Sequence, residues 1–401
     1  MPGTRAEQFG SGGHVGHAGS AGHTGSWNQI RSGLVWPSLL RTAGLALRPA
    51  RLGFGVIMIV AVALLDRLGQ SWSGRDQGPI TTLASNAGGS LSSVVRGVLR
   101  LEPGAGARAG FGQIRGLLDD LWLAPLSSIT IIALSMLVVG VLGLATARSA
   151  ATESARLKKQ TWTEAMGFAV SRWTSAWLTL IGPVLISTLL LAFLAAAGWA
   201  GLSLPWLQAV GGALFCFAML IATAVVLLLA LTLLGAPMLL PALACEATDG
   251  IDAVQRTMAY VAARPLQYGA YVLILCVQAA ITTALLIMLA VLVSETARAA
   301  ATAWTPSSVD PGRVLEGSSA SLRAMNAGIL FWLNVPLLLV GGYVTSFVHT
   351  GGTVLYLAMR RVCDGQDVDD VWMPGSIPGL RDPEMDRRPT GAAGEGGDDD
   401  E

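Results

Sequence analysis

The sequence predicts an all-α integral membrane protein with about six transmembrane helices, amphipathic cytoplasmic elbow helices, and disordered N- and C-terminal tails. Hydrophobic residues make up 52% of the 401 residues and charged residues only 13%, whereas an ordinary soluble domain carries about 25% charged residues. The longest segment without Asp, Glu, Lys or Arg runs from Trp173 to Cys245. A membrane-spanning helix needs only about 20 mostly apolar residues, so this segment alone has room for two spans.

Both ends of the chain are polar. Residues 1–35 are rich in Gly, Ser and His and bury too little apolar area to offset the entropy of ordering, so we expect them to be disordered. His14, His17 and His23 lie in this tail. Histidine-rich tracts are only compositional hints of metal binding, and no metal site or cofactor is predicted. Residues 373–401 are predicted to be a disordered acidic tail.

Residues 36–372 are predicted to form one six-span domain. The expected spans cover residues 52–68, 126–147, 176–199, 210–234, 268–293 and 328–359, with an extracytoplasmic loop over 69–125. The first apolar run, Leu52 to Leu65, is short for a span. Arg51 and Arg67 are expected to lengthen it by extending their charged ends to the membrane interfaces.

Basic residues predict the orientation. The short segments on the N-terminal side of the membrane hold both lysines, Lys158 and Lys159, and ten arginines: Arg41, Arg48, Arg51, Arg148, Arg156, Arg172, Arg256, Arg264, Arg360 and Arg361. The outside turn between the third and fourth spans holds none, the outside loop between the fifth and sixth holds three, and the long first outside loop holds six, where charge has less influence on topology. Because basic loops stay in the cytoplasm, both termini are predicted to be cytoplasmic. The expected location is the bacterial inner membrane, crossed several times.

Two stretches between spans are predicted to be amphipathic helices with N-terminal caps. Thr161 and Glu164 have the spacing of a capping box. Asp249 is expected to accept from the backbone N–H of Asp252, whose own charge suits the helix dipole. Glu246, Asp249 and Asp252 also allow a catalytic or metal-binding interpretation. The structural interpretation is favoured, since capping is the commonest reason for Asp at such a position.

Three stretches carry a family resemblance: "ATARSAATESARLKKQTWTEAMGFAVSRW", "LLPALACEATDGIDAVQRTMAYVAARPLQY" and "TGGTVLYLAMRRVCDGQDVDDVW". They resemble a family of bacterial polytopic inner-membrane proteins of uncharacterised activity. More distantly, they are similar to the multi-span membrane domain attached to some glycerophosphodiester phosphodiesterases. The resemblance covers about Arg48 to Trp372. The phosphodiesterase catalytic domain has no counterpart in the sequence, so the resemblance implies a fold and no activity.

Ionisable residues are nearly missing from the predicted spans, with His349 the one clear case. A polar stripe surrounds it, formed by Tyr343, Ser346, Thr350 and Thr353. Such residues either line a path for a ligand or proton or let helices approach and hydrogen-bond. A lone histidine without an acidic partner favours packing. Alanines spaced at i+4 predict further close-packing faces: Ala192, Ala196 and Ala200 in the third span, and Ala218 and Ala222 in the fourth.

No P-loop, HExxH or GxSxG motif occurs, and the zero net charge gives no attraction to nucleic acid. The leading hypothesis is a non-enzymatic scaffold or subunit of a membrane complex, with the lipid bilayer and other membrane proteins as partners. The first alternative is a small-molecule or lipid transporter. The second is a membrane enzyme with a carboxylate site at the cytoplasmic face.

Overall fold

The structure is a computed structural model that describes residues 36–373, except 101, 103, 107, 111, 113–123, 156–159, 204–207, 303–319 and 369. Both predicted disordered tails, apart from Met373, lie outside the described residues, as do the N-terminal histidines, Lys158 and Lys159. The described residues form helices and turns without a strand. The predicted all-α membrane fold is therefore confirmed.

Six helices of the described chain are long and apolar enough to cross a membrane. They are α4 (Pro49–Ser73), α7 (Pro125–Ser154), α9 (Trp173–Ser203), α11 (Phe215–Glu246), α13 (Pro265–Thr302) and α14 (Ala320–Asp364). Five of them extend beyond both ends of the predicted span, whereas α11 begins at Phe215, after the predicted start at residue 210, and continues beyond residue 234 to Glu246. The first span thus reaches full length through its own helix, without relying on extended arginine side chains.

Proline and left-handed residues mark several helix boundaries. Pro49, Pro125 and Pro265 each stand at the start of a long helix, where the missing backbone N–H costs no hydrogen bond. Gly74, with φ of 67°, ends α4, because glycine adopts the left-handed conformation without steric cost. Ala247 ends α11 with φ of 53° although it is not glycine.

Shorter helices connect the spans: α2 (Trp36–Leu39), α3 (Thr42–Ala46), α5 (Pro79–Leu99), α8 (Trp162–Ser171), α10 (Gln208–Ala213) and α12 (Gly250–Ala263). Within residues 69–125, predicted as the extracytoplasmic loop, α4 continues to Ser73 and α5 follows. Asp66 of α4 fixes the first turn of α5, since its Oδ1 accepts from the backbone N–H of Ile80 at 2.8 Å. This contact spans 14 positions of sequence, so local glycine and serine content did not reveal it.

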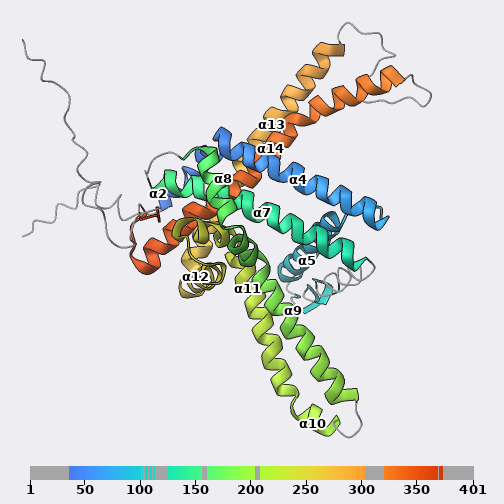
Figure 1. Cartoon of the computed structure of the whole chain (residues 1–401), viewed down its shortest axis with the longest axis vertical. Helices are drawn as coiled ribbons and strands as arrows, with labels where there is room; N and C mark the ends of the chain where they lie inside the picture. The colour runs from blue at the N-terminus through green and yellow to red at the C-terminus, as the bar shows by residue number, and fades with distance from the viewer. Residues whose placement is uncertain are drawn as a thin grey trace, which may run out of the picture. The chain divides into compact units, whose positions relative to one another are not determined.

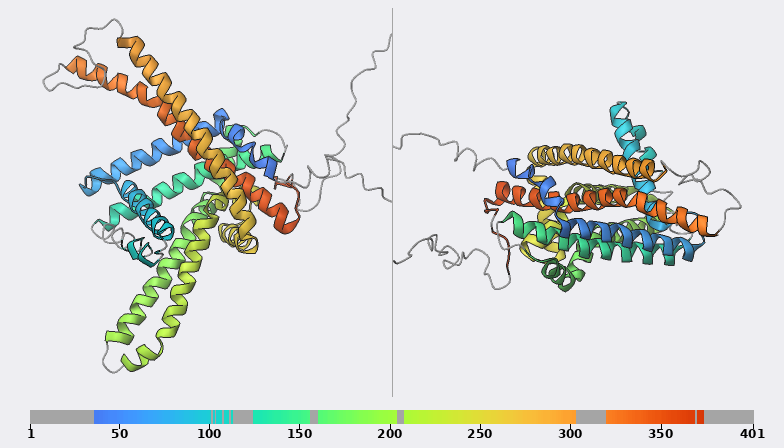
Figure 2. Two further views of the ribbon diagram at one scale, coloured as in Figure 1. Left: turned by 180° about the vertical axis from the view of Figure 1, so that it is seen from behind. Right: turned by 90° about the horizontal axis from the view of Figure 1, so that it is seen from above.

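The long helices pack in neighbouring pairs, α4 with α7, α9 with α11, and α13 with α14 (Figure 1). Figure 2 shows the same pairs from two further directions. Buried residues concentrate in the C-terminal parts of α7, α11 and α14. There, α8 packs on α7, and α12 packs on α11 and α9. The core therefore lies around one set of helix ends.

Glycines allow the closest helix crossings. A Cβ at Gly55 of α4 would overlap the carbonyl oxygen of Gly342 in α14. A Cβ at Gly352 would overlap the carbonyl oxygen of Pro237 in α11. Because Pro241 has no backbone N–H, that carbonyl lacks its usual intrahelical donor. The two crossings hold α14 against α4 and α11 at backbone distance.

Candidate functional site

A tyrosine–carboxylate cluster joins the ends of α11, α12 and α14. Glu246 accepts a hydrogen bond from Tyr356 and forms an ion pair with Arg256. Tyr260 donates to Asp364, and its ring lies 5.7 Å from the ring of Tyr356. Burial, together with the hydrogen bond to Asp364, raises the pKa of Tyr260 well above its ordinary value. The cluster therefore pairs the hydroxyls of Tyr356 and Tyr260 with the side chains of Glu246 and Asp364.

The three carboxylates considered as a catalytic or metal set do not act together. Glu246 is bound to Tyr356 and Arg256, whereas Asp249 and Asp252 are both exposed. Among the described residues, no group of three or more His, Cys, Asp or Glu side chains has a metal-binding arrangement.

Of the two predicted caps, one has the expected contacts. Thr161 and Glu164 form the reciprocal capping box of α8, with the Thr161 N–H donating to Glu164 at 2.9 Å. Asp249 occupies the N-cap position of α12 and Asp252 its first turn, but the Asp249 side chain makes no capping hydrogen bond. The predicted contact was wrong because tertiary contacts hold this helix start. Gly250 packs against α9, and Arg172 donates to the carbonyl of Ala247.

Arg51 anchors the first turn of α4 to α7. Its side chain is 1% exposed and donates to the Leu45 carbonyl at 2.7 Å, the Ser149 carbonyl at 2.8 Å and Glu153 at 2.6 Å. Arg48 forms a second ion pair with Glu153. The expectation that Arg51 extends to the membrane interface was wrong. Its carboxylate and carbonyl partners satisfy a charge that would otherwise need water.

Arg148 of α7 is fully buried, yet it forms no ion pair with a carboxylate among the residues that the structure describes. It donates to the carbonyls of Ala244 at 2.9 Å and Trp372 at 2.8 Å. Its guanidinium carbon lies 4.6 Å from the centroid of the Phe168 ring. Aromatic faces and carbonyl oxygens carry partial negative charge, and together they compensate the guanidinium.

The segment after α14 covers Arg148. We call residues 365–373, without 369, the C-terminal strap. Gly365, with φ of 70°, turns the chain back, and the N–H of Trp372 donates to the Cys245 carbonyl at 2.9 Å. Arg360 donates to the backbone carbonyls of Asp367 and Asp370. Two buried arginines thus hold the strap over the ends of α7, α11 and α14.

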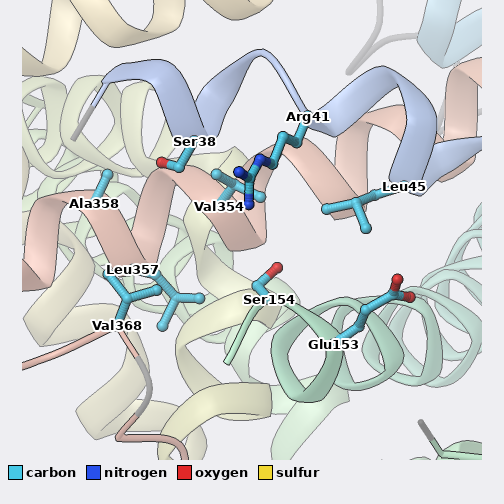
Figure 3. Close-up of a pocket in the computed structure, with 9 residues that line it drawn as sticks. All are labelled: Ser38, Arg41, Leu45, Glu153, Ser154, Val354, Leu357, Ala358 and Val368. Atoms are coloured by element: carbon cyan, nitrogen blue, oxygen red, sulfur yellow. The ribbon is translucent and has the colours of Figure 1, made fainter. Parts of the chain in front are cut away.

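A pocket of about 200 Å³ lies beside these clusters. Its polar residues are Ser38, Arg41, Glu153 and Ser154, and its apolar wall includes Leu45, Val354 and Leu357 (Figure 3). Arg41 comes from the turn between α2 and α3, and Ser154 from the last residue of α7. Figure 3 shows both side chains pointing into the same space from different elements.

The polar stripe of α14 contacts several neighbours. The Tyr343 hydroxyl donates to Thr282 of α13 at 2.7 Å, and the Ser346 hydroxyl donates to the Ala46 carbonyl at 2.8 Å. Thr353 donates to the carbonyl of His349 in its own helix, and Thr350 has no hydrogen-bond partner among the described residues. The His349 ring lies against Gly143 of α7, where an added Cβ would come within 2.6 Å.

Sequence reasoning missed Arg148, Arg360, Tyr260, Tyr356 and the strap. Arg148 and Arg360 were counted only as loop charges. One sequence feature could have indicated the burial of Arg148, because small residues beside an arginine allow neighbouring helices to approach and enclose it. The alanines within one helical turn of Arg148 are all fully buried: Ala145, Ala147, Ala150 and Ala151.

Comparison with known protein families, curated proteins and solved structures gives no match. The resemblance to the membrane domain of glycerophosphodiester phosphodiesterases therefore stays a prediction.

Proposed function

We propose that the protein is a non-enzymatic, multi-pass protein of the bacterial inner membrane, with both termini in the cytoplasm. In this proposal it serves as a scaffold or as a subunit of a membrane complex. The observation that carries the proposal is the exposed surface of the α9–α11 pair. Only 11% of the apolar part of α9 and 6% of that of α11 are buried, as little as in α14 and α13, against 44% for α7.

The composition of that surface supports a protein partner beside lipid. Ala192 and Ala196, predicted to pack closely, are exposed on α9. Within membranes, small residues at i+4 favour helix association because they let two backbones approach. A helix of another protein is therefore the expected occupant of this face.

The charged clusters support a structural role over chemistry. Glu246 and Asp364 are engaged by Tyr356, Arg256 and Tyr260, and these contacts join three helices. A catalytic carboxylate must contact the substrate, whereas the carboxylates of Glu246 and Asp364 bind side chains of neighbouring helices. The conservative change Glu246→Gln is expected to leave cellular function intact once protein abundance is normalised.

In-membrane photo-crosslinking tests the scaffold proposal. A photoreactive residue at Ala196 is expected to give a discrete protein adduct in native membranes. The matched control is Leu64, on the exposed face of α4 and 58% exposed, where lipid adducts should dominate. Lipid adducts alone at both positions would contradict the proposal.

Substitution of His349 distinguishes the scaffold proposal from the transporter alternative. If its ring only packs against Gly143, His349→Gln should keep both abundance and cellular function. Normal abundance with lost, pH-dependent function would favour a transporter, because a titrating imidazole would then be needed.

A further inference from the structure

The pocket beside Glu153 has an excess of positive charge. Arg48 and Arg51 share Glu153, while the Arg41 guanidinium has no hydrogen-bond or ion-pair partner among the described residues. Two arginines therefore pair with Glu153, and a third, Arg41, lines the same pocket. Since Glu153 is already paired with two guanidiniums, its repulsion of an incoming anion is offset, and Arg41 is available to bind one.

A second polar group in the pocket lacks a partner. The Ser154 hydroxyl oxygen is buried and has no hydrogen-bond partner among the described residues. An unsatisfied buried hydroxyl is destabilising, and a bound acceptor would remove that cost. Arg41 and Ser154 both face the pocket (Figure 3), so one ligand oxygen group can contact both.

The remaining walls are apolar and belong mainly to a spanning helix. Val354, Leu357 and Ala358 come from α14, and Leu45 from the segment before α4. The pocket therefore lies where α4 begins and α7 ends. An anion with an attached hydrocarbon part fits this combination of an arginine, a hydroxyl donor and an apolar wall.

We propose that this pocket binds a phosphate ester, with Arg41 pairing to the phosphate oxygens and Ser154 donating its hydroxyl. Guanidinium groups match phosphate with two parallel hydrogen bonds. Val368 of the strap completes the apolar wall, which can contact the hydrocarbon part of the ligand. The phosphate can belong to the headgroup of an anionic lipid or to a soluble phosphorylated compound.

Binding to the purified full-length protein tests the site. In detergent, native mass spectrometry would compare retained phosphatidylglycerol with retained phosphatidylcholine. Arg41→Gln is expected to reduce phosphatidylglycerol binding about tenfold, the effect of losing one charge-assisted contact. Ser154→Ala should reduce it severalfold. The matched control is Arg264→Gln, because Arg264 is also exposed but lies at the end of α12, outside the pocket.

Competition identifies the source of the phosphate group. Displacement of the lipid by millimolar inorganic phosphate would support a site for soluble phosphorylated compounds. Retention of the lipid under the same conditions would support a headgroup site. Equal losses in Arg41→Gln and Arg264→Gln, or equal binding of both lipids, would overturn the proposal. Arg41 is exposed, so its variant should fold, and the result does not depend on the scaffold proposal.

Discussion

At the residue scale, Arg148 is the most unusual group in the molecule. It is fully buried without a carboxylate partner, and its Nε has no acceptor among the described residues. Its stability rests on the reach of the guanidinium, which contacts the Ala244 and Trp372 carbonyls while stacking on Phe168. The positive charge alone therefore does not explain why an arginine is stable at this buried position.

Substitution of Arg148 separates charge from shape. Arg148→Lys keeps the charge but loses the planar fork that reaches two carbonyls. Arg148→Met removes the charge and keeps most of the volume. We expect Arg148→Lys to lower the free energy of unfolding by about 2–4 kcal/mol, because a buried charge without partners is costly. Arg148→Met is expected to lower it less. Chemical denaturation in detergent measures both. Better tolerance of Lys than of Met would mean that the charge itself is required.

Glycine positions in α4 give a second residue-scale prediction. Gly55 faces the backbone of α14, whereas a Cβ at Gly53 would meet nothing within 4 Å. Gly55→Ala should destabilise the protein by about 1–3 kcal/mol through overpacking. Gly53→Ala should be neutral or slightly stabilising, since alanine favours a helix. Thermal unfolding of the two variants provides the comparison; equal effects would contradict the close crossing.

At the element scale, the start of α8 depends on its cap and the start of α12 on tertiary contacts. Thr161→Ala should cost about 1 kcal/mol, the typical loss of an N-cap. Asp249→Ala should cost clearly less, because its side chain caps nothing. Gly250→Ala should cost more than either, since its Cβ would lie 2.6 Å from the Ser175 carbonyl oxygen. Unfolding measurements that rank Asp249→Ala above Thr161→Ala would contradict this assignment.

The elements differ in how far the sequence alone could predict them. The six spans and the two amphipathic helices follow from local composition and period, and the Thr161 capping box follows from a short local motif. The helical period of residues 90–101 indicates part of α5, but its first turn could not be predicted, because Asp66 fixes that turn from another helix. The strap also could not be predicted from the sequence, since its contacts join Trp372 to Cys245 and Arg148. These pairings depend on three-dimensional placement rather than on local pattern.

At the scale of the whole molecule, arginines at one set of helix ends account for much of the long-range order. Arg51 joins α4 to α7, Arg148 joins α7 to α11 and the strap, and Arg172 joins the start of α9 to the end of α11. The opposite ends of α9 and α11 lack such arginine contacts among the described residues. These contacts therefore lie at the end that the arginine distribution predicts to be cytoplasmic.

The predicted orientation is tested by thiol labelling. Only a cysteine whose thiol is accessible to the reagent can report on the side of the membrane. Cys245 is fully buried and should stay unlabelled on either side of the membrane. Cys363 is partly exposed near the end of α14, and Gln208→Cys in α10 provides a reporter for the opposite end. Labelling at positions 363 and 208 would be measured in a protein in which Cys216 and Cys276 are replaced by serine.

In sealed cells, a membrane-impermeant maleimide is expected to label the cysteine at position 208 and to spare Cys363 until the membrane is permeabilised. This result follows if basic loops stay inside and if α11, α13 and α14 each cross the bilayer. The reverse pattern would mean the opposite orientation. Labelling of both in sealed cells would place both positions outside, and an odd number of crossings between them would then be excluded.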